Sequence, residues 1–170
     1  LLIIFVLVES RVSDPVLDLG LIRGNRVFAA ATTAAFLNYA GLYGVTTLTA
    51  VFLEVTQGFS AQRAGLLLLV QPAFMVALSP IFGRMSDTIG SRAPAGGGML
   101  LAAAGTAQLG LLPSPVTEWR VLLALAFVGI GMAAFSSPNT SSAMGSVSRS
   151  QLSLASGFLA TMRTAGEEFA

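Results

Sequence analysis

The 170-residue sequence contains no cysteine, no histidine and no lysine. Without cysteine and histidine, the chain forms no disulfide, lacks most zinc, haem and iron–sulfur ligands, and has no Ser–His or Cys–His catalytic pair. Nine arginines and eight acidic residues leave a net charge of +1, without any basic stripe. We therefore expect no metal, no cofactor, no nucleic-acid partner and no enzymatic activity.

Charge is also scarce: charged residues make up 10% of the sequence and apolar residues 54%, with a mean hydropathy of +0.79. A soluble domain carries about 25% charged residues. Four long runs contain no charge, at 27–53, 64–83, 93–117 and 121–148. About 20 apolar residues in a helix cross a bilayer core, and the alternation of membrane strands is absent. The sequence predicts an all-α membrane protein, a multi-pass transmembrane helix bundle with spans at about 27–53, 64–83, 93–113 and 120–138.

Both ends of the sequence resemble parts of further helices. Residues 1–8 are apolar but too few to cross a bilayer, so we interpret them as the end of one helix. Residues 153–170 are interpreted as the start of another helix. We expect residues 1–170 to be a fragment of a larger membrane domain.

Arginine is divided unequally between the two sides that alternating spans create. The links at 9–26, 84–92 and 138–151 share one side and hold six arginines, whereas the links at 54–63 and 113–120 hold two. Because arginine-rich links stay on the cytoplasmic side of a membrane protein, the first group is expected to face the cytoplasm.

Proline and small residues indicate where the spans bend and meet. Pro72 and Pro80 remove backbone donors within the second span and are expected to kink or loosen it. Small residues in the third and fourth spans predict closely packed helices, with flexible gating as the alternative. They are Gly96, Gly97, Gly98, Gly105, Gly110, Gly129, Gly131, Ala133 and Ala134.

The segment GRMSDTIGSR (residues 83–92) holds three charges between two apolar runs. Gly83 and Gly90 are expected to permit a tight turn. We expect Asp87 to cap the following helix, and Arg84 and Arg92 to pair with Asp87 or with helix carbonyl ends.

The order of these residues resembles the signature Gly-x-x-x-Asp-x-x-Gly-x-Arg/Lys of the major facilitator superfamily, matched by Gly83, Asp87, Gly90 and Arg92. Thr88 departs from the pattern, which usually has a basic residue there. The resemblance implies a cytoplasmic loop between the second and third helices of a six-helix half. In the family this loop is thought to act as a conformational latch between the two halves during alternating access.

Further motifs are similar to the fourteen-helix drug:proton antiporter branch of this superfamily, the EmrB/QacA type. They are DPVLDL at 14–19, QGFS at 57–60, AG at 64–65, QP at 71–72, SSPNT at 136–140, MGSV at 144–147 and MRT at 162–164. The resemblance implies a partial major facilitator fold, holding the end of helix 8, helices 9 to 12 and the start of helix 13. The implied setting is the bacterial cytoplasmic (inner) membrane.

The implied function is secondary active transport, with proton-coupled export of drugs or other amphipathic small molecules. The expected partners are a small-molecule substrate, the lipid bilayer and the N-terminal half of the same protein. Uptake, transport of a single metabolite, or a non-transport membrane subunit are the alternatives. Because the four spans contain no titratable acid or base in their interiors, a proton carrier is expected in the other half.

Polar residues within the spans are candidates for lining a substrate cavity. Asn38, Tyr39 and Tyr43 are expected to share one helix face, and Gln71 and Asn139 lie beside prolines. Hydrogen bonding between helices is the alternative interpretation of these side chains.

Near the end of the sequence, Arg163 and Glu167 lie four residues apart and form a candidate helix charge pair. Glu168 follows directly. A buried protonatable pair and an altered chain end are the two interpretations of the double glutamate.

Overall fold

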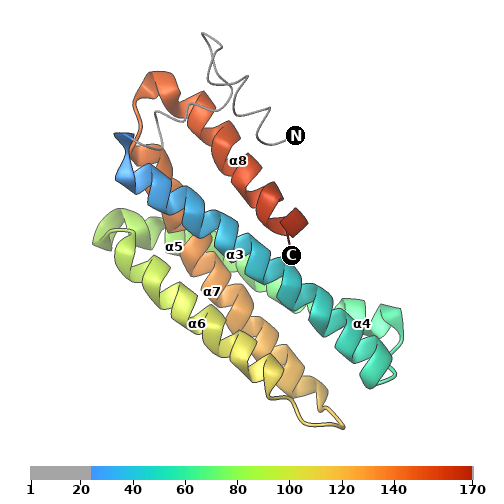
Figure 1. Cartoon of the computed structure of the whole chain (residues 1–170). Coiled ribbons are helices and arrows are strands. Elements are labelled where there is room, and N and C mark those ends of the chain that lie inside the picture. The colour runs from blue at the N-terminus through green and yellow to red at the C-terminus, as the bar shows by residue number, and fades with distance from the viewer. Residues whose placement is uncertain (1–23, 170) are drawn as a thin grey trace, which may run out of the picture.

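The computed structural model describes residues 24–169, so the expected helix end at 1–8 and the DPVLDL motif lie outside the described residues. Within this range the chain is helical, with no strand (Figure 1). The helices are α3 (Arg26–Val51), α4 (Ala61–Leu68), α5 (Val70–Ile89), α6 (Arg92–Gly110), α7 (Glu118–Gly145) and α8 (Leu152–Phe169). A π-helical turn (Phe52–Thr56) extends α3, and a 3₁₀ turn (Arg149–Gln151) precedes α8.

Three of the described helical segments are long and apolar enough to cross a membrane. They are Arg26–Thr56, Ala61–Ile89 and Glu118–Gly145. α6 is not among them, because glycine and alanine make up most of it and lower its hydropathy. Its 19 residues still form a helix roughly 28 Å long. Each of the four expected spans is mostly helical, and the all-α bundle predicted from the sequence is confirmed.

Two helices begin with side-chain caps that the sequence provides. Asn25 Oδ1 accepts a hydrogen bond from the backbone N–H of Phe28 at 3.0 Å, at the start of α3. Ser60 Oγ accepts from the N–H of Arg63 at 3.3 Å, at the start of α4. Each cap satisfies one of the N–H groups that a helix start leaves without an intrahelical partner.

The prolines have different effects on their helices. The second span is interrupted at Leu69, between α4 and α5, because Pro72 cannot donate to the carbonyl of Leu68. α5 continues through Pro80, and α7 continues through Pro138 to Gly145. The fourth span is therefore longer than the expected 120–138, because one lost hydrogen bond does not end a helix whose neighbours hold it in place.

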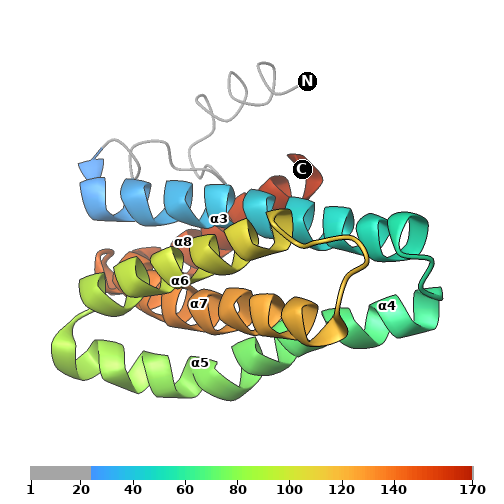
Figure 2. The same cartoon turned by 90° about the horizontal axis from the view of Figure 1, so that it is seen from below.

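α7 is the central helix, with α5 and α6 on either side of it (Figure 2). Small residues permit this arrangement, since a Cβ added to Gly98 would lie 2.6 Å from the carbonyl oxygen of Gly131. A Cβ on Gly105 would lie 2.7 Å from the carbonyl of Ala124. These contacts confirm the predicted close packing, although Gly96, Gly97 and Gly110 have no such neighbour.

α3 packs against α8 and the end of α7. The buried residues of this contact are Phe28, Ala31, Ala35, Ala143, Ala155, Phe158 and Leu159. A second cluster, with Leu53, Ala64, Leu67, Val121 and Leu125, joins α3, α4 and α7 at the opposite end. Large apolar side chains elsewhere, such as Leu48, Val76 and Leu100, are more than two-thirds exposed and provide the surface that lipid requires.

Candidate functional site

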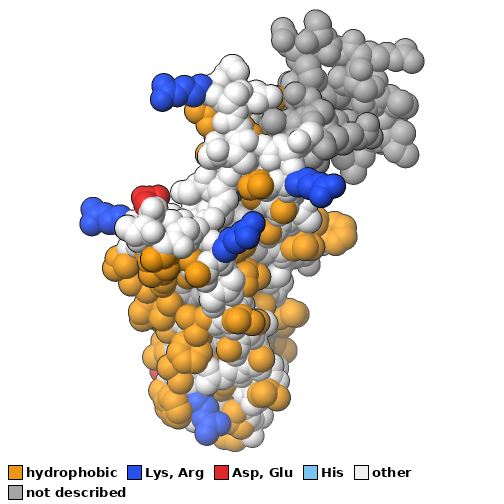
Figure 3. Space-filling model, turned by 90° about the vertical axis from the view of Figure 1, so that its left-hand side faces the viewer, with side chains coloured by type: hydrophobic (Ala, Val, Ile, Leu, Met, Phe, Trp, Pro, Cys, Tyr) orange, Lys and Arg blue, Asp and Glu red, His pale blue; other side chains and the backbone are white. Residues whose placement is uncertain are grey.

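One end of the bundle carries most of the described arginines. Asn25 Nδ2 donates to the carbonyl of Ser146 at 2.5 Å, and Ser142 Oγ donates to Ser91 Oγ at 2.5 Å. The start of α3, the α5–α6 link and the end of α7 therefore meet at what we call the arginine-rich end. Its exposed arginines are Arg26, Arg84, Arg92 and Arg149. Figure 3 shows basic side chains around this end and an apolar surface below it.

The GRMSDTIGSR segment is mostly helical, and only two of its residues form the link. α5 continues to Ile89, which leaves Gly90 and Ser91 between α5 and α6. Gly90 has a φ of 82°, in the left-handed region that favours glycine, so the predicted turn there is confirmed. A turn at Gly83 is wrong, because Gly83 lies within α5 and permits close packing instead. A Cβ added there would lie 2.8 Å from Ser137 Oγ on α7.

The charged side chains of this segment do not form the expected pairs. Asp87 is exposed on the last turn of α5, and α6 starts after Ser91 without a side-chain cap. Capping by Asp87 is therefore wrong, because α5 continues to Ile89 and keeps Asp87 within its own last turn. Arg84 and Arg92 are also exposed, and neither forms an ion pair with Asp87 within residues 24–169. The three charges remain accessible, and their role as a latch stays a prediction.

The candidate cavity residues of α3 face two different neighbours. Asn38 is buried, and its Nδ2 donates to the sulfur of Met99 on α6 at 3.0 Å. Tyr39 lies beside α8, where the guanidinium carbon of Arg163 is 5.5 Å from the centroid of its ring. Tyr43, one turn further along α3, is 52% exposed. Because successive residues of a helix point about 100° apart, the structure separates Asn38 from the two tyrosines.

The other two candidates join helices to one another. Gln71 is buried, and its Oε1 accepts a hydrogen bond from Thr46 Oγ1 on α3 at 3.3 Å. Asn139 Nδ2 donates to the carbonyl of Ala31 at 2.9 Å. Both side chains therefore make the interhelical hydrogen bonds of the alternative interpretation.

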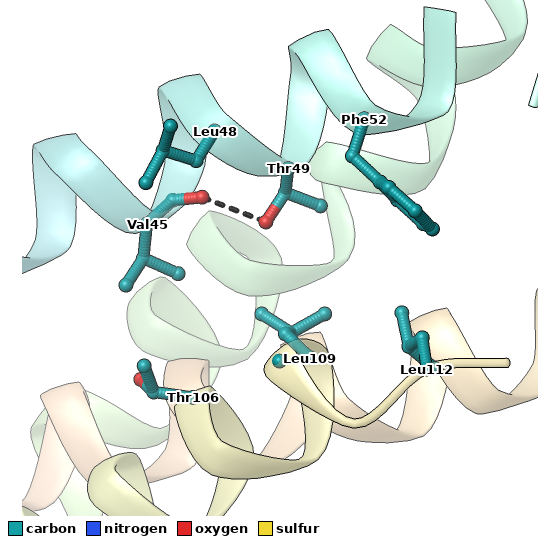
Figure 4. A pocket seen from close by; sticks show the side chains of 8 residues that line it. Val45, Leu48, Thr49, Phe52, Thr106, Leu109 and Leu112 are labelled. Atoms are coloured by element: carbon teal, nitrogen blue, oxygen red, sulfur yellow. Dashed lines mark hydrogen bonds between the residues drawn. The ribbon is translucent and has the colours of Figure 1, made fainter. Parts of the chain in front are cut away.

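Two adjoining cavities lie between α3 and α6, with volumes of about 320 and 410 Å³. Val45 and Thr106 line both of them. Figure 4 shows the smaller one, where apolar side chains of α3 face those of α6 and Thr49 donates to the carbonyl of Val45 at 2.7 Å. Asn38 lines the larger one, and its buried Oδ1 has no hydrogen-bond partner among the described residues. The two cavities are therefore lined mostly by apolar side chains, and Asn38 provides the one amide among the described residues that line them.

Arg163 has a partner that the sequence analysis did not identify. Its Nη2 donates to Thr140 Oγ1 on α7 at 2.6 Å. Glu167 is exposed, and the predicted pair with Arg163 does not form within the described residues. The contact with Thr140 joins positions 23 residues apart on different helices, so helical spacing alone does not indicate it.

These helices, with their exposed apolar surfaces and polar ends, define an integral membrane helix bundle. The sequence pattern of the Major Facilitator Superfamily matches residues 6–169. The chain therefore belongs to the major facilitator superfamily of transporters.

Several curated proteins are similar to the chain. The multidrug resistance protein Stp of Mycobacterium tuberculosis is 33% identical over 167 residues, which cover 96% of this chain and 30% of Stp. The riboflavin transporter RibZ of Clostridioides difficile is 30% identical, over 95% of this chain and 36% of RibZ. The quinolone resistance protein NorB of Staphylococcus aureus is 23% identical, over 98% of this chain and 36% of NorB. The chain thus spans about a third of the length of these relatives.

Proposed function

We propose that the chain is part of a proton-coupled secondary transporter that exports drugs or other amphipathic small molecules by alternating access. The observation that carries this proposal is the 33% identity with the multidrug resistance protein Stp over 96% of the chain. The motifs quoted above favour the fourteen-helix antiporter branch, in the bacterial cytoplasmic membrane. The name of NorB, a quinolone resistance protein, agrees with a drug substrate.

The arginine-rich end supports the assignment of sides and of a latch. Four exposed arginines lie there, and Arg63 and Arg120 lie at the other end, as expected if the first end faces the cytoplasm. Asp87, Arg84 and Arg92 are exposed and make no ion pair with one another. In the proposed function they bind the other half of the transporter in one of its conformations.

Proton coupling requires a titratable group inside the membrane. The acidic side chains of the four complete spans, Glu54, Asp87 and Glu118, lie at or near helix ends. We therefore place the proton carrier in the remainder of the full-length protein.

Transport of a single metabolite is a second candidate, because RibZ is named as a riboflavin transporter and is 30% identical to the chain. The two candidates differ in the compound that moves and in its direction. Riboflavin uptake, without any change in drug accumulation, would favour the second candidate.

The experiment that tests the proposal measures ethidium fluorescence in bacterial cells that express the full-length protein. We expect these cells to accumulate less ethidium than cells with an empty vector, and a protonophore to abolish the difference. Equal accumulation in the two strains, or a difference that survives the protonophore, would contradict proton-coupled export.

A further inference from the structure

Arg163 lies about midway along the length of the bundle, far from the helix start. It is the twelfth residue of α8 (Leu152–Phe169), whose first turn lies near the arginine-rich end. Eleven residues of α-helix rise roughly 16 Å, about half of a 30 Å bilayer core. A charged guanidinium at this depth raises the free energy of the folded protein unless a partner compensates its charge, so such residues usually have a function.

The contacts of Arg163 do not balance its charge. Nη2 donates to the hydroxyl of Thr140, which is neutral and itself donates to the carbonyl of Ser136 at 2.8 Å. The face of the Tyr39 ring attracts the cation at a centroid distance of 5.5 Å. The Nε atom is buried and has no hydrogen-bond partner among the described residues. An unpaired donor and an unbalanced charge both raise the free energy of the bundle.

No carboxylate within residues 24–169 supplies the missing negative charge. Glu167, one turn further along α8, is exposed and makes no ion pair, and Glu168 is exposed as well. The single ion pair of the described residues joins Arg63 to Glu118, which lie at the opposite end of the bundle. Arg163 is half-buried, so part of the side chain remains accessible to an anion.

We propose that Arg163, Thr140 and Tyr39 form a binding site for the carboxylate group of an amphipathic aromatic compound. The planar guanidinium offers paired N–H donors that match the two oxygens of a carboxylate. Thr140 holds the guanidinium from α7, and Tyr39 holds it from α3. Tyr43 is exposed one turn beyond Tyr39 on α3, and in the proposed site its ring offers a surface to the aromatic part of the compound.

This inference rests on the proposed transport function, since it names the substrate class that the transporter binds. A carboxylate can come from the substrate or from an acidic side chain elsewhere in the full-length protein. We assign it to the substrate, because the exposed ring of Tyr43, one turn beyond Tyr39, offers a surface for an aromatic compound that an acidic side chain alone would not use.

Two dyes that differ in one group test the assignment. Rhodamine B carries a free carboxylate, and its ethyl ester has the same cationic ring system without that charge. We expect the purified full-length protein to bind rhodamine B about tenfold more tightly than the ester, as a charge-assisted hydrogen bond predicts. Fluorescence anisotropy gives both dissociation constants.

Variants then connect this preference to Arg163. R163Q should reduce the ratio of the two dissociation constants to about one. R163K should retain part of the ratio because lysine keeps the positive charge, and lose the rest because lysine lacks the paired N–H donors of the guanidinium. T140V should lower the ratio while leaving the affinity for the ester unchanged. R149Q removes an exposed arginine at the helix end and should leave the ratio as in the wild type.

Equal binding of the two dyes by the wild type would overturn the substrate assignment, as would a preference that survives in R163Q. If the dyes bind equally and R163Q lowers the melting temperature, the carboxylate belongs to the protein. The binding measurement does not depend on transport. A preserved preference without ethidium export would therefore contradict the proposed function alone.

Discussion

Asn139 on α7 donates from Nδ2 to the backbone carbonyl of Ala31 on α3, at a distance of 2.9 Å. The bond lies next to Pro138 and beside the buried contact of Phe28 with Phe158, whose ring centroids are 5.7 Å apart. It therefore fixes the position of α3 against the central helix. Further along α3, Asn38 contacts Met99 on α6 and Tyr39 contacts Arg163 on α8.

Replacing Asn139 with leucine removes this hydrogen bond. We expect the free energy of unfolding of the full-length protein to fall by about 1 kcal/mol, the usual contribution of an interhelical hydrogen bond in a membrane. A thermal melt of the purified protein measures the change. T161V is the control, because the hydroxyl of Thr161 bonds only to the carbonyl of Gly157 on its own helix. A melting temperature equal to that of T161V would contradict the role of Asn139.

The contact of α6 with α7 leaves no room for a side chain at Gly98, where an added Cβ would lie 2.6 Å from a backbone oxygen. We expect G98A to destabilise the protein by about 1–3 kcal/mol, since overpacking forces the two backbones apart. Gly97, on the same helix, has no atom within 4 Å of an added Cβ, so G97A should be neutral or slightly stabilising. Thermal melts that rank the two variants in the opposite order would refute this packing.

Asp87 is exposed at the arginine-rich end, so its substitution should change function and not folding. We expect D87N to reduce ethidium export toward the level of cells with an empty vector. Immunoblots of isolated membranes should show an unchanged amount of the protein. E54Q neutralises an exposed carboxylate at the opposite end and should retain export. Export by D87N at the wild-type level would contradict a role of Asp87 in the latch.

The ion pair between Arg63 and Glu118 connects the starts of α4 and α7. Its side chains are 58% and 39% exposed, so we expect R63Q to lower the free energy of unfolding by less than about 1 kcal/mol. The loss should become smaller as salt is added, because ions screen exposed charges. A double-mutant cycle with E118Q isolates the pair. A coupling energy well above this value, independent of salt, would contradict a solvent-screened contact.

The sequence predicted which segments are helical, because long runs without charge permit little else in a membrane. It also predicted the turn at Gly90 and the loosened helix at Pro72. The extent of α7 was underestimated, since Pro138 was treated as the end of a span. The helix continues because the polar side chains around the proline bond to neighbouring backbone, as Asn139 does to Ala31.

The site residues were predictable only in part. Asn38, Gln71 and Asn139 were identified as polar residues in apolar spans, but their partners depend on which helices meet. Arg163 was paired with Glu167 by helical spacing, whereas in the structure it reaches Thr140 on another helix. Spacing along one helix cannot reveal a partner that tertiary packing brings close.

The most direct test uses proteoliposomes that contain the full-length protein and an imposed pH gradient. Ethidium is a permanent cation, so a pH gradient alone does not concentrate it across the membrane. We predict that protons leaving an acidic interior drive ethidium inward, and that the accumulation stops when a protonophore collapses the gradient. Ethidium entry at the same rate with and without the gradient would contradict proton-coupled antiport.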